Sequence, residues 1–424
     1  MFAIIADDLT GACDTAAKLS ERGIFVQVLL EMPDPVQSIE YRQVIAVNTN
    51  SRSLPADEAY QKVKDAVHKL KQQGFTTYYK KIDSMFRGNV AVEIQAMMEA
   101  LQCSLAIITS AVPKNNRKII DGRLIVKYLP DNGTEVLKSV FSDRIEQCAN
   151  INLRTVRKGV LKIKEEILRE IELGKKIFLM DSDSEDDIGA IAAVCETLPH
   201  NVLYVGASSF IAPLSMNWCV ETIKAINEDK LQGILQQNKS LLYVIGTNNP
   251  VSLDQVRYMI DQERIPNIKV DVIQCTSGNW DVEAKRCLDS ADILLHSMPK
   301  SFLVVVDSID NGIVIEGNRN NGEKSIPEIT GCISQVVKTI LQKYEFGAMV
   351  LVGGDTAQAV LSAMGVKTMQ IICEYAPGIP MAIIQLGNNK EMVVVTRSGG
   401  FGEPDSFVGF QNYLNELCEK TEVT

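Results

Sequence analysis

Short apolar runs alternate with amphipathic helical stretches along most of the chain, and polar or glycine-rich residues follow most of the runs. This alternation is typical of a parallel α/β sheet, whose strands are buried on both faces and joined by helices. In the first half, the runs predict strands at residues 2–6, 25–30, 44–48, 76–82, 105–109, 176–180 and 202–205. In the second half, they predict strands at residues 241–245, 268–273, 302–307, 348–352, 369–373, 381–386 and 392–396.

The pattern also predicts the helices and the domain boundary. Helices are expected at about residues 12–23, 55–73 and 161–174. Further helices are expected to end near residues 101 and 364, to run through residue 226 to about residue 237, to begin at residue 250, and to lie at the C-terminus. The 424 residues favour two domains, divided at the polar segment QQNKS into residues 1–237 and 238–424. We therefore predict an α/β protein of two domains, each a mainly parallel sheet flanked by helices, with the active site in the cleft between them.

Composition narrows the classes of function. The formal net charge of −10 argues against a nucleic-acid or anionic-membrane partner, so local Arg and Lys must hold any anionic substrate. The chain shows no signal-peptide pattern and no apolar run of about 18 residues, and a cytoplasmic location is expected. Ten cysteines without a C-x-x-C pair indicate reduced thiols and no zinc site. The three histidines adjoin no nucleophile motif, which leaves proton transfer to carboxylates.

The stretch IADDLTG carries the first candidate chemistry. Asp7 and Asp8 follow the first predicted strand and precede a helix N-terminus, at the edge of a parallel sheet where ligands bind. Two neighbouring carboxylates repel each other, so the fold must offset that cost. Helix capping by Asp8 or Thr10 is the alternative role, but it leaves one of the two carboxylates unexplained.

Further polar residues follow other strands of the first half. The loop TNSRSL brings Asn50 and Arg52, and KKIDSMFRGN lies between a strand and a helix. In SAVPKNNRKIIDGRL, Arg117 is expected in a polar loop that positions a ligand, although a solvated basic face is equally compatible. The acidic run DSDSEDD lacks calcium-loop spacing, so helix capping that begins at Ser184 is favoured over a cation site.

The second half holds three small-residue loops, GTNNP, GGDTA and SGGFG, each after a predicted strand. Glycine lets backbone N–H groups approach phosphate closely, and three such loops at one end of a sheet favour a nucleotide site. Neither a Walker loop nor a clear Rossmann fingerprint occurs. Phosphate loops in one domain and carboxylates in the other indicate phosphoryl transfer, with a carboxylate to orient or deprotonate the attacking hydroxyl.

Several ordered motifs together resemble the four-carbon acid sugar kinases. They are ADDLTGACD at 6–14, KKIDSMFRGN at 80–89, VPKNNRKIIDG at 112–122, GASS at 206–209, VGGDTA at 352–357 and RSGGFGEPD at 397–405. The resemblance covers nearly the whole chain. It implies ATP-dependent phosphorylation of the terminal hydroxyl (O4) of threonate, erythronate or 3-oxo-tetronate in sugar-acid catabolism, with the acid bound by the N-terminal domain and ATP by the C-terminal one.

The resemblance also implies roles for individual positions. The acid-sugar pocket would be lined by Asp7, Asp8, Asp83, Ser84, Arg87 and Arg117. Asp7 or Asp8 would be the base, and the two arginines would bind the substrate carboxylate in a bidentate way. ATP would be held by Gly246, Gly353, Gly354, Asp355, Thr356, Gly399, Gly400 and Gly402, with Mg²⁺ bridging its phosphates. Asp355 would reach the metal through water or, alternatively, cap the following helix.

The chain departs from the family pattern in three places. Arg397 stands where Lys is frequent, GTNNP replaces a Gly-Ser turn, and Met85 and Phe86 stand where Thr and Leu are common. The changes at Met85 and Phe86, near Asp83, leave the identity of the substrate open. Two other functions remain as alternatives: a non-catalytic sensor of a sugar acid and a nucleotide, and an aspartyl phosphatase. Adjacent aspartates point to opposite sides of a strand, which counts against the phosphatase. The oligomeric state is open, with a homodimer among the states considered.

Overall fold

The computed structural model describes residues 1–32, 44–126, 133–198, 201–214, 228–296, 299–307, 322–387, 390–400 and 402–419. The chain divides into two compact units, Met1–Ala225 and Ile226–Thr424. The second unit therefore includes helix α9 (Glu228–Gln237), which the sequence-based boundary assigns to the first domain. The boundary after residue 237 stays a prediction.

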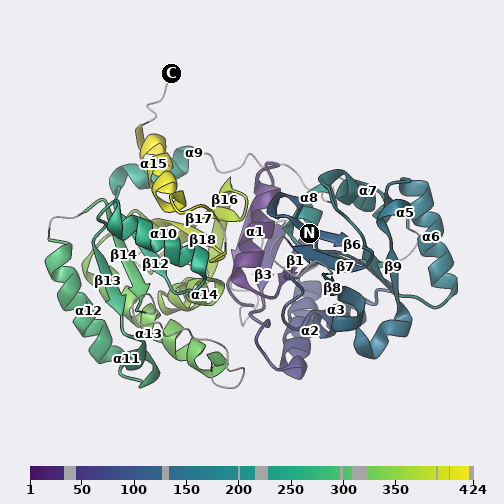
Figure 1. The fold of residues 1–424 in the computed structure, drawn as a ribbon, viewed down its shortest axis with the longest axis horizontal. Coiled ribbons are helices and arrows are strands. Elements are labelled where there is room, and N and C mark those ends of the chain that lie inside the picture. Colours follow the sequence, from purple (N-terminus) through teal and green to yellow (C-terminus); the bar gives the residue numbers. More distant parts are fainter. Residues whose placement is uncertain are drawn as a thin grey trace. The chain divides into compact units, whose positions relative to one another are not determined.

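The first unit is built on a parallel sheet that Figure 1 shows with helices around it. The strand order is β2–β3–β1–β4–β11–β5–β10–β9. Its strands are β1 (Phe2–Ala6), β2 (Val26–Leu29), β3 (Val44–Asn48), β4 (Thr77–Lys81), β5 (Leu105–Thr109), β9 (Cys148–Ile151), β10 (Ile177–Met180) and β11 (Val202–Gly206). Every residue of β1, β3, β5 and β10 is buried, as expected for strands covered by helices on both faces. The sequence missed β9.

Helices flank this sheet. They are α1 (Leu9–Ser20), α2 (Ala56–Gln72), α3 (Val90–Leu101), α4 (Val136–Val140), α5 (Leu153–Val156), α6 (Val160–Glu172), α7 (Glu185–Cys195) and α8 (Ser208–Leu214). α1 begins three residues earlier than predicted, because the side chain of Asp8 accepts a hydrogen bond from the Gly11 N–H and so caps the helix there.

Strand order places the point where the chain connections of the first sheet change direction between β1 and β4. These strands are neighbours, but their chain connections run in opposite directions along the strand order. The connection through α1 leads from β1 toward the β2 edge of the sheet, and the one through α3 leads from β4 toward the β9 edge, to β5. Chain connections that diverge in this way open a crevice at the carboxyl ends of the two strands. Asp7 follows β1 and Asp83 follows β4 at this point.

The structure corrects the prediction of a polar loop around Arg117. Residues Arg117–Ile120 (β6) and Arg123–Val126 (β7) form an antiparallel hairpin, which β8 (Thr134–Glu135) extends to a three-stranded sheet. The prediction was wrong because the interrupted charges of RKIIDGRL hide the pairing of two short strands. Asp121 and Gly122 form the turn, both with positive φ.

The second unit has the strand order β13–β14–β12–β15–β18–β17–β16. Its strands are β12 (Leu241–Ile245), β13 (Asn267–Val270), β14 (Ser301–Val306), β15 (Ala348–Val352), β16 (Thr368–Ala376), β17 (Ile379–Gln385) and β18 (Glu391–Arg397). Pairing is parallel from β13 to β18, whereas β17 is antiparallel to both β18 and β16. The predicted strand at 268–273 ends at Val270, since Asp271 caps a helix by accepting from two backbone N–H groups.

Besides α9, the helices of this unit are α10 (Pro250–Asp261), α11 (Val272–Thr276), α12 (Trp280–Leu294), α13 (Gly322–Lys343), α14 (Gly354–Ala363) and α15 (Ser406–Glu419). Here too the connections diverge from two neighbouring strands, since α10 leads from β12 toward β13 and α14 leads from β15 toward β16. The crevice of the second sheet therefore lies at the carboxyl ends of β12 and β15.

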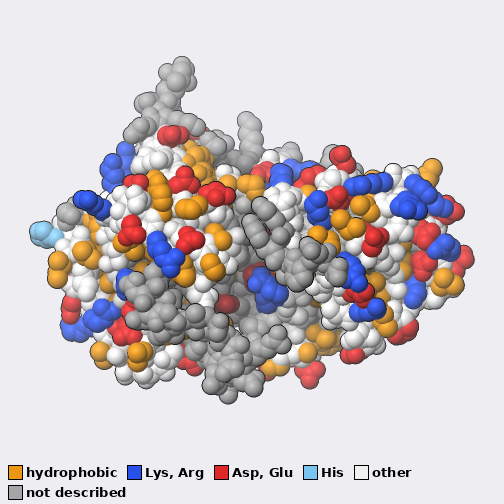
Figure 2. Space-filling model, viewed as in Figure 1, with side chains coloured by type: hydrophobic (Ala, Val, Ile, Leu, Met, Phe, Trp, Pro, Cys, Tyr) orange, Lys and Arg blue, Asp and Glu red, His pale blue; other side chains and the backbone are white. Residues whose placement is uncertain are grey.

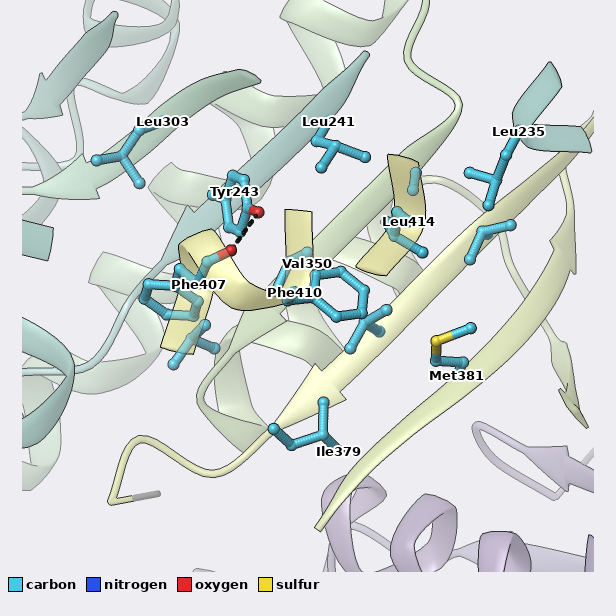
Figure 3. Packing of buried hydrophobic residues seen from close by; sticks show 14 of the residues in the cluster. Leu235, Leu241, Tyr243, Leu303, Val350, Ile379, Met381, Phe407, Phe410 and Leu414 are labelled. Carbon is cyan, nitrogen blue, oxygen red and sulfur yellow. Dashed lines mark hydrogen bonds between the residues drawn. The ribbon is translucent and has the colours of Figure 1, made fainter. Parts of the chain in front are cut away.

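A cluster of buried apolar side chains holds the second sheet and α15 together (Figure 3). Phe407, Phe410 and Leu414 of α15 pack on strand residues such as Val350 and Met381. The Tyr243 hydroxyl donates to the Phe407 carbonyl at 3.1 Å, so the phenol's polar end is satisfied inside the cluster.

Charges of both signs are interspersed over the face drawn in Figure 2, and apolar side chains occur among them. Within the part of the chain that the structure describes, each helix is too short or too polar to cross a lipid bilayer. Eight described cysteines carry free thiols.

Candidate active site

One arginine joins the two carboxylates that follow β1. Arg52 Nε donates to Asp7 Oδ2 at 2.7 Å and Nη2 donates to Asp7 Oδ1 at 3.0 Å, which is a bidentate pair. Its third nitrogen, Nη1, donates to Asp8 Oδ2 at 2.7 Å. Both aspartates thus face the same guanidinium, and the expectation that they point to opposite sides of a strand is wrong. The strand ends at Ala6, so its alternation does not extend to Asp8.

The two carboxyl groups have opposite pKa shifts. Burial alone would raise the pKa of Asp7, but the charges of Arg52, Lys80 and Lys81 outweigh it and lower that pKa. Burial and the neighbouring Asp7 charge raise the pKa of Asp8, against the pull of Arg52. Paired titratable groups whose environments separate their pKa values mark an acid–base assignment. Asp8 is therefore the better proton acceptor of the two.

Asp83 lies in the same group of charges, at the end of β4. Arg87 Nε and Nη2 each donate to one of its oxygens at 2.8 Å, and Arg52 Nη2 lies 3.8 Å from Asp83 Oδ1. Burial would raise the pKa of Asp83, but the hydrogen bond from Arg87 and the charge of Arg52 hold it well below its usual range. The Arg87 side chain is 63% exposed, so solvent reaches much of its guanidinium even while it is paired with Asp83.

Arg117 comes to this region from the hairpin. Its Nη1 donates to the hydroxyl of Ser84, next to Asp83. Burial lowers the pKa of Arg117, and the Asp83 charge opposes that shift. Four of the predicted pocket residues therefore cluster around Arg52 as ion-pair partners or near neighbours, and the other two, Ser84 and Arg117, form the adjoining pair.

A buried polar network lies behind Asp7. Lys80 Nζ is 2.7 Å from Glu93 Oε2, and both side chains are at most 1% exposed. Glu93 Oε1 also accepts from the hydroxyl of Ser51 at 2.6 Å, and the Ser51 hydroxyl lies 2.8 Å from that of Thr49. The network fixes the loop before Arg52 through side chains of β4 and α3.

Lys81 and Gly11 close the other side of the site. The Lys81 ammonium donates to the Ile82 carbonyl at 2.8 Å. A Cβ placed on Gly11 would lie 2.8 Å from that ammonium and 2.6 Å from Asp8 Oδ1. Any side chain at this position would therefore displace one or both of these charged groups.

In the second unit, two of the predicted phosphate loops meet at Thr356. A Cβ on Gly246 would lie 2.1 Å from Thr356 Oγ1, and one on Gly353 would lie 3.3 Å from it. Gly353 has a φ of +105°, which favours glycine, and is followed by Gly354 as the first residue of α14.

The third loop reaches the first through Thr247 and Asn249. A Cβ on Gly399 would lie 2.7 Å from Thr247 Oγ1, and one on Gly400 would lie 3.4 Å from Asn249 Nδ2. The Ser252 hydroxyl donates to the Gly399 carbonyl at 2.6 Å. The three loops thus come together beside the N-termini of α10 and α14. Gly402 continues this segment with a φ of +86°.

The capping role considered for Asp355 is corrected, and Arg397 is placed in the interior of this unit. Asp355 does not cap α14, because Gly353 is the N-cap residue and no side chain bonds there; the Asp355 side chain is exposed in the first turn. Arg397 is 2% exposed and donates to Gln255 Oε1 at 2.9 Å, with Cζ 4.8 Å from the Phe407 ring centroid. Burial lowers its pKa to about 10. Arg397 thus joins α10 and α15 through these contacts.

The acidic run at residues 181–187 is a helix cap. Ser184 and Asp187 form a capping box at the start of α7, and Asp181 accepts three backbone N–H groups. Among the described residues, no group of three or more His, Cys, Asp or Glu side chains could hold a metal ion.

Models of known protein domains divide the chain into the same two parts as the predicted chemistry. A model of a sugar-binding N-terminal domain matches residues 2–214, and a model of a nucleotide-binding C-terminal domain matches residues 242–407. The D-threonate kinase of Salmonella typhimurium is 27% identical, covering 98% of this chain and 98% of its own. The D-erythronate kinase of Heliobacterium modesticaldum is 26% identical, covering 97% of this chain and 96% of its own. The chain belongs to the four-carbon acid sugar kinase family.

Membership of this family confirms the resemblance seen in the motifs. A crystal structure of a Salmonella typhimurium LT2 protein has a TM-score of 0.75 at 20% identity, covering 97% of this chain and 99% of that one, and confirms the fold. In this four-carbon acid sugar kinase, Arg52 is the centre of the group of carboxylates, a role that the sequence analysis did not identify. Its place directly after a strand was the available signal, but its two partners lie 45 and 44 residues away.

Proposed function

We infer that this protein transfers the terminal phosphoryl group of ATP to the terminal hydroxyl of a four-carbon sugar acid. It is an enzyme of the family that phosphorylates an alcohol group on such acids. The observation that carries the inference is the match, over nearly the whole length of all chains, to kinases of D-threonate and D-erythronate. The clustered carboxylates in one unit and the glycine loops in the other supply the chemistry that this reaction needs.

Asp8 is the proposed general base. Its raised pKa makes it a better proton acceptor than Asp7, and its Oδ1 and Oδ2 each retain a lone pair beyond the bonds to Gly11 and Arg52. The base accepts the proton as the hydroxyl oxygen attacks the phosphorus, and ADP leaves. Asp7, whose pKa is lowered, stays ionised and holds Arg52 in place.

Arg87 and Arg117 are the proposed partners of the substrate carboxylate. Arg87 is largely exposed and Arg117 projects from the hairpin beside Ser84. A guanidinium binds a carboxylate through two parallel N–H bonds, which fixes the acid end of the substrate. Asp83 holds Arg87 in this region before the substrate arrives.

The three glycine loops are the proposed nucleotide site. Backbone N–H groups at Gly353, Gly354 and Gly399 and the N-terminus of α14 suit phosphate oxygens. Mg²⁺ usually needs only one or two protein carboxylates beside the phosphates, and the exposed Asp355 in the first turn of α14 fits that need, through water. When bound, the ion neutralises charge on the transferred group.

The first test is ADP release by the purified protein with Mg-ATP and D- or L-threonate, D- or L-erythronate, or their 3-oxo forms. We expect turnover with at least one of them and at least a hundredfold loss of kcat in Asp8→Asn, because the general base contributes about 10²–10⁴-fold. Wild-type-like kcat in Asp8→Asn would remove Asp8 from the mechanism.

Two other functions have less support. The family relatives are named as kinases, which leaves the non-catalytic sensor without a counterpart among them. The same kinase names leave the aspartyl phosphatase without a counterpart among these relatives. Nucleotide binding without turnover of any of the acids would favour the sensor.

A further inference from the structure

We propose that Arg52 is the positioning residue that holds Asp8 ionised and aligned as the base. The proposal rests on the proposed kinase function and assigns a role to a residue outside the predicted pocket set. Arg52 acts through the two carboxylates that it contacts.

The geometry gives this arginine all the contacts that such a role needs. Two of its nitrogens hold Asp7 in a bidentate pair, and the third bonds Asp8 at 2.7 Å. Asp8 Oδ1 is meanwhile fixed by the Gly11 N–H at 2.8 Å. The carboxylate of Asp8 is therefore held at both oxygens, one by the helix it caps and one by Arg52.

The backbone around Arg52 is itself tied down. Its N–H donates to the Asp7 carbonyl at 3.3 Å, and the N–H of Ser51 donates to the same oxygen at 3.0 Å. Asn89 Nδ2 donates to the Ser51 and Leu54 carbonyls at 2.9 and 2.8 Å. A Cβ on Gly88 would lie 2.8 Å from Arg52 Cγ, so the turn that precedes α3 packs directly on the side chain. A side chain held this firmly loses little further entropy in orienting a carboxylate.

The charges that face Asp8 show what Arg52 contributes. Asp7 lies beside Asp8 and disfavours its ionised form, while Arg52 and Lys81 favour that form. Beyond them, Lys80 acts on Asp7, and Arg87 pairs with Asp83. Arg52 is the cation in direct contact with both members of the repelling pair. Its removal leaves Asp7 and Asp8 against each other, with the charges of Lys80 and Lys81 on Asp7 and of Lys81 on Asp8 as the remaining compensation.

The test compares Arg52→Gln and Arg52→Lys with the wild type. Loss of a cation in contact with a carboxylate raises its pKa by about 1–3 units. Because the base must be ionised, we expect the acidic limb of the kcat/KM profile to move to higher pH by about that amount in Arg52→Gln. Arg52→Lys keeps the charge but not the fork of donors, so we expect a smaller pH shift together with a lower kcat.

A second readout needs no turnover. The ¹³C carboxyl resonance of Asp8, assigned with Asp8→Asn, is titrated in wild type and variants, and we expect the same upward pKa shift in Arg52→Gln. Arg157→Gln is the matched control, because Arg157 also pairs with a carboxylate, that of Asp187 at 3.1 Å, but at the start of α7. It is expected to change neither the pH profile nor the Asp8 titration.

The outcomes separate this proposal from the proposed function. Failure of the wild type to phosphorylate any acid would overturn the kinase assignment, while the Asp8 titration would still decide the role of Arg52. An unchanged Asp8 pKa in Arg52→Gln would overturn the proposal, whatever the activity. If Arg52→Gln does not fold, Arg52→Lys decides: wild-type kcat with a wild-type titration would equally overturn it.

Discussion

At the scale of single residues, the site combines groups that are costly to bury. Lys80 and Glu93 form an ion pair that solvent does not reach, and Glu93 also accepts from Ser51. Such a pair contributes little net stability over apolar side chains, but removal of one partner leaves an uncompensated buried charge. What the ion pair does is fix the position of the loop that carries Arg52.

The energetics of that ion pair can be measured directly. We expect Lys80→Met and Glu93→Leu each to lower the free energy of unfolding by about 3–5 kcal/mol, because each strands the other charge. The double variant Lys80→Met/Glu93→Leu is expected to be more stable than either single one. Urea unfolding of the three variants and the wild type measures this. Single variants that each lose under about 1 kcal/mol would show that water or a neighbour compensates the stranded charge.

At the scale of elements, the start of α1 places the base. Asp8 caps the helix while Gly11 leaves space for the Asp8 carboxylate and the Lys81 ammonium. Helix formation and base positioning thus depend on the same turn. This arrangement lets a helix variant separate stability from activity.

Gly11→Ala provides that separation. Its methyl group would lie 2.6 Å from Asp8 Oδ1, so we expect kcat/KM to fall about 10²-fold, as a displaced catalytic group does. Alanine favours helix by about 0.5–1 kcal/mol, which offsets a loss of similar size from the displaced Asp8 cap, so the net change in stability should be small. Gly189→Ala in α7 is the control, since a Cβ there meets nothing within 4 Å. Steady-state kinetics and thermal unfolding of both variants test this; equal kcat/KM in the two would contradict it.

At the scale of the whole molecule, two units carry two kinds of site. Carboxylates and arginines lie at the crevice of the first sheet, and glycine loops lie at the crevice of the second. The net charge of −10 gives no general attraction for anionic ligands, so local groups must hold each of them.

A variant in one unit should therefore lose the stabilisation by one ligand and keep the stabilisation by the other. A ligand at 100 times its Kd stabilises by about 2.7 kcal/mol. We expect Gly246→Ala, whose Cβ would lie 2.1 Å from Thr356 Oγ1, to lose the shift from a non-hydrolysable ATP analogue but keep that from the sugar acid. Arg117→Ala should do the reverse. Thermal unfolding with each ligand measures the shifts. Loss of both shifts in either variant would contradict the assignment of one ligand to each unit.

Much of this protein was determined by local sequence. Apolar runs predicted the strands from β1 to β5 within a few residues, because burial on both faces leaves a continuous apolar signal. The motifs could be placed at strand ends for the same reason, and parallel strands bring those ends to one edge. The family followed from motifs in order along the chain. Short or interrupted elements, such as β9 and the β6–β7 hairpin, were missed because their signal depends on pairing partners.

Only the tertiary structure decided how the residues of the site meet. Strand order sets β1 beside β4 and β12 beside β15, and no local pattern encodes it, since it results from pairing between distant segments. The union of Arg52 with Asp7 and Asp8 and the separation of the two carboxyl pKa values depend on that order and on burial. The sequence determined which residues could do the chemistry. Long-range packing decided which of these residues interact through their charges. The reason is that desolvation and charge–charge interaction act through space and not along the chain.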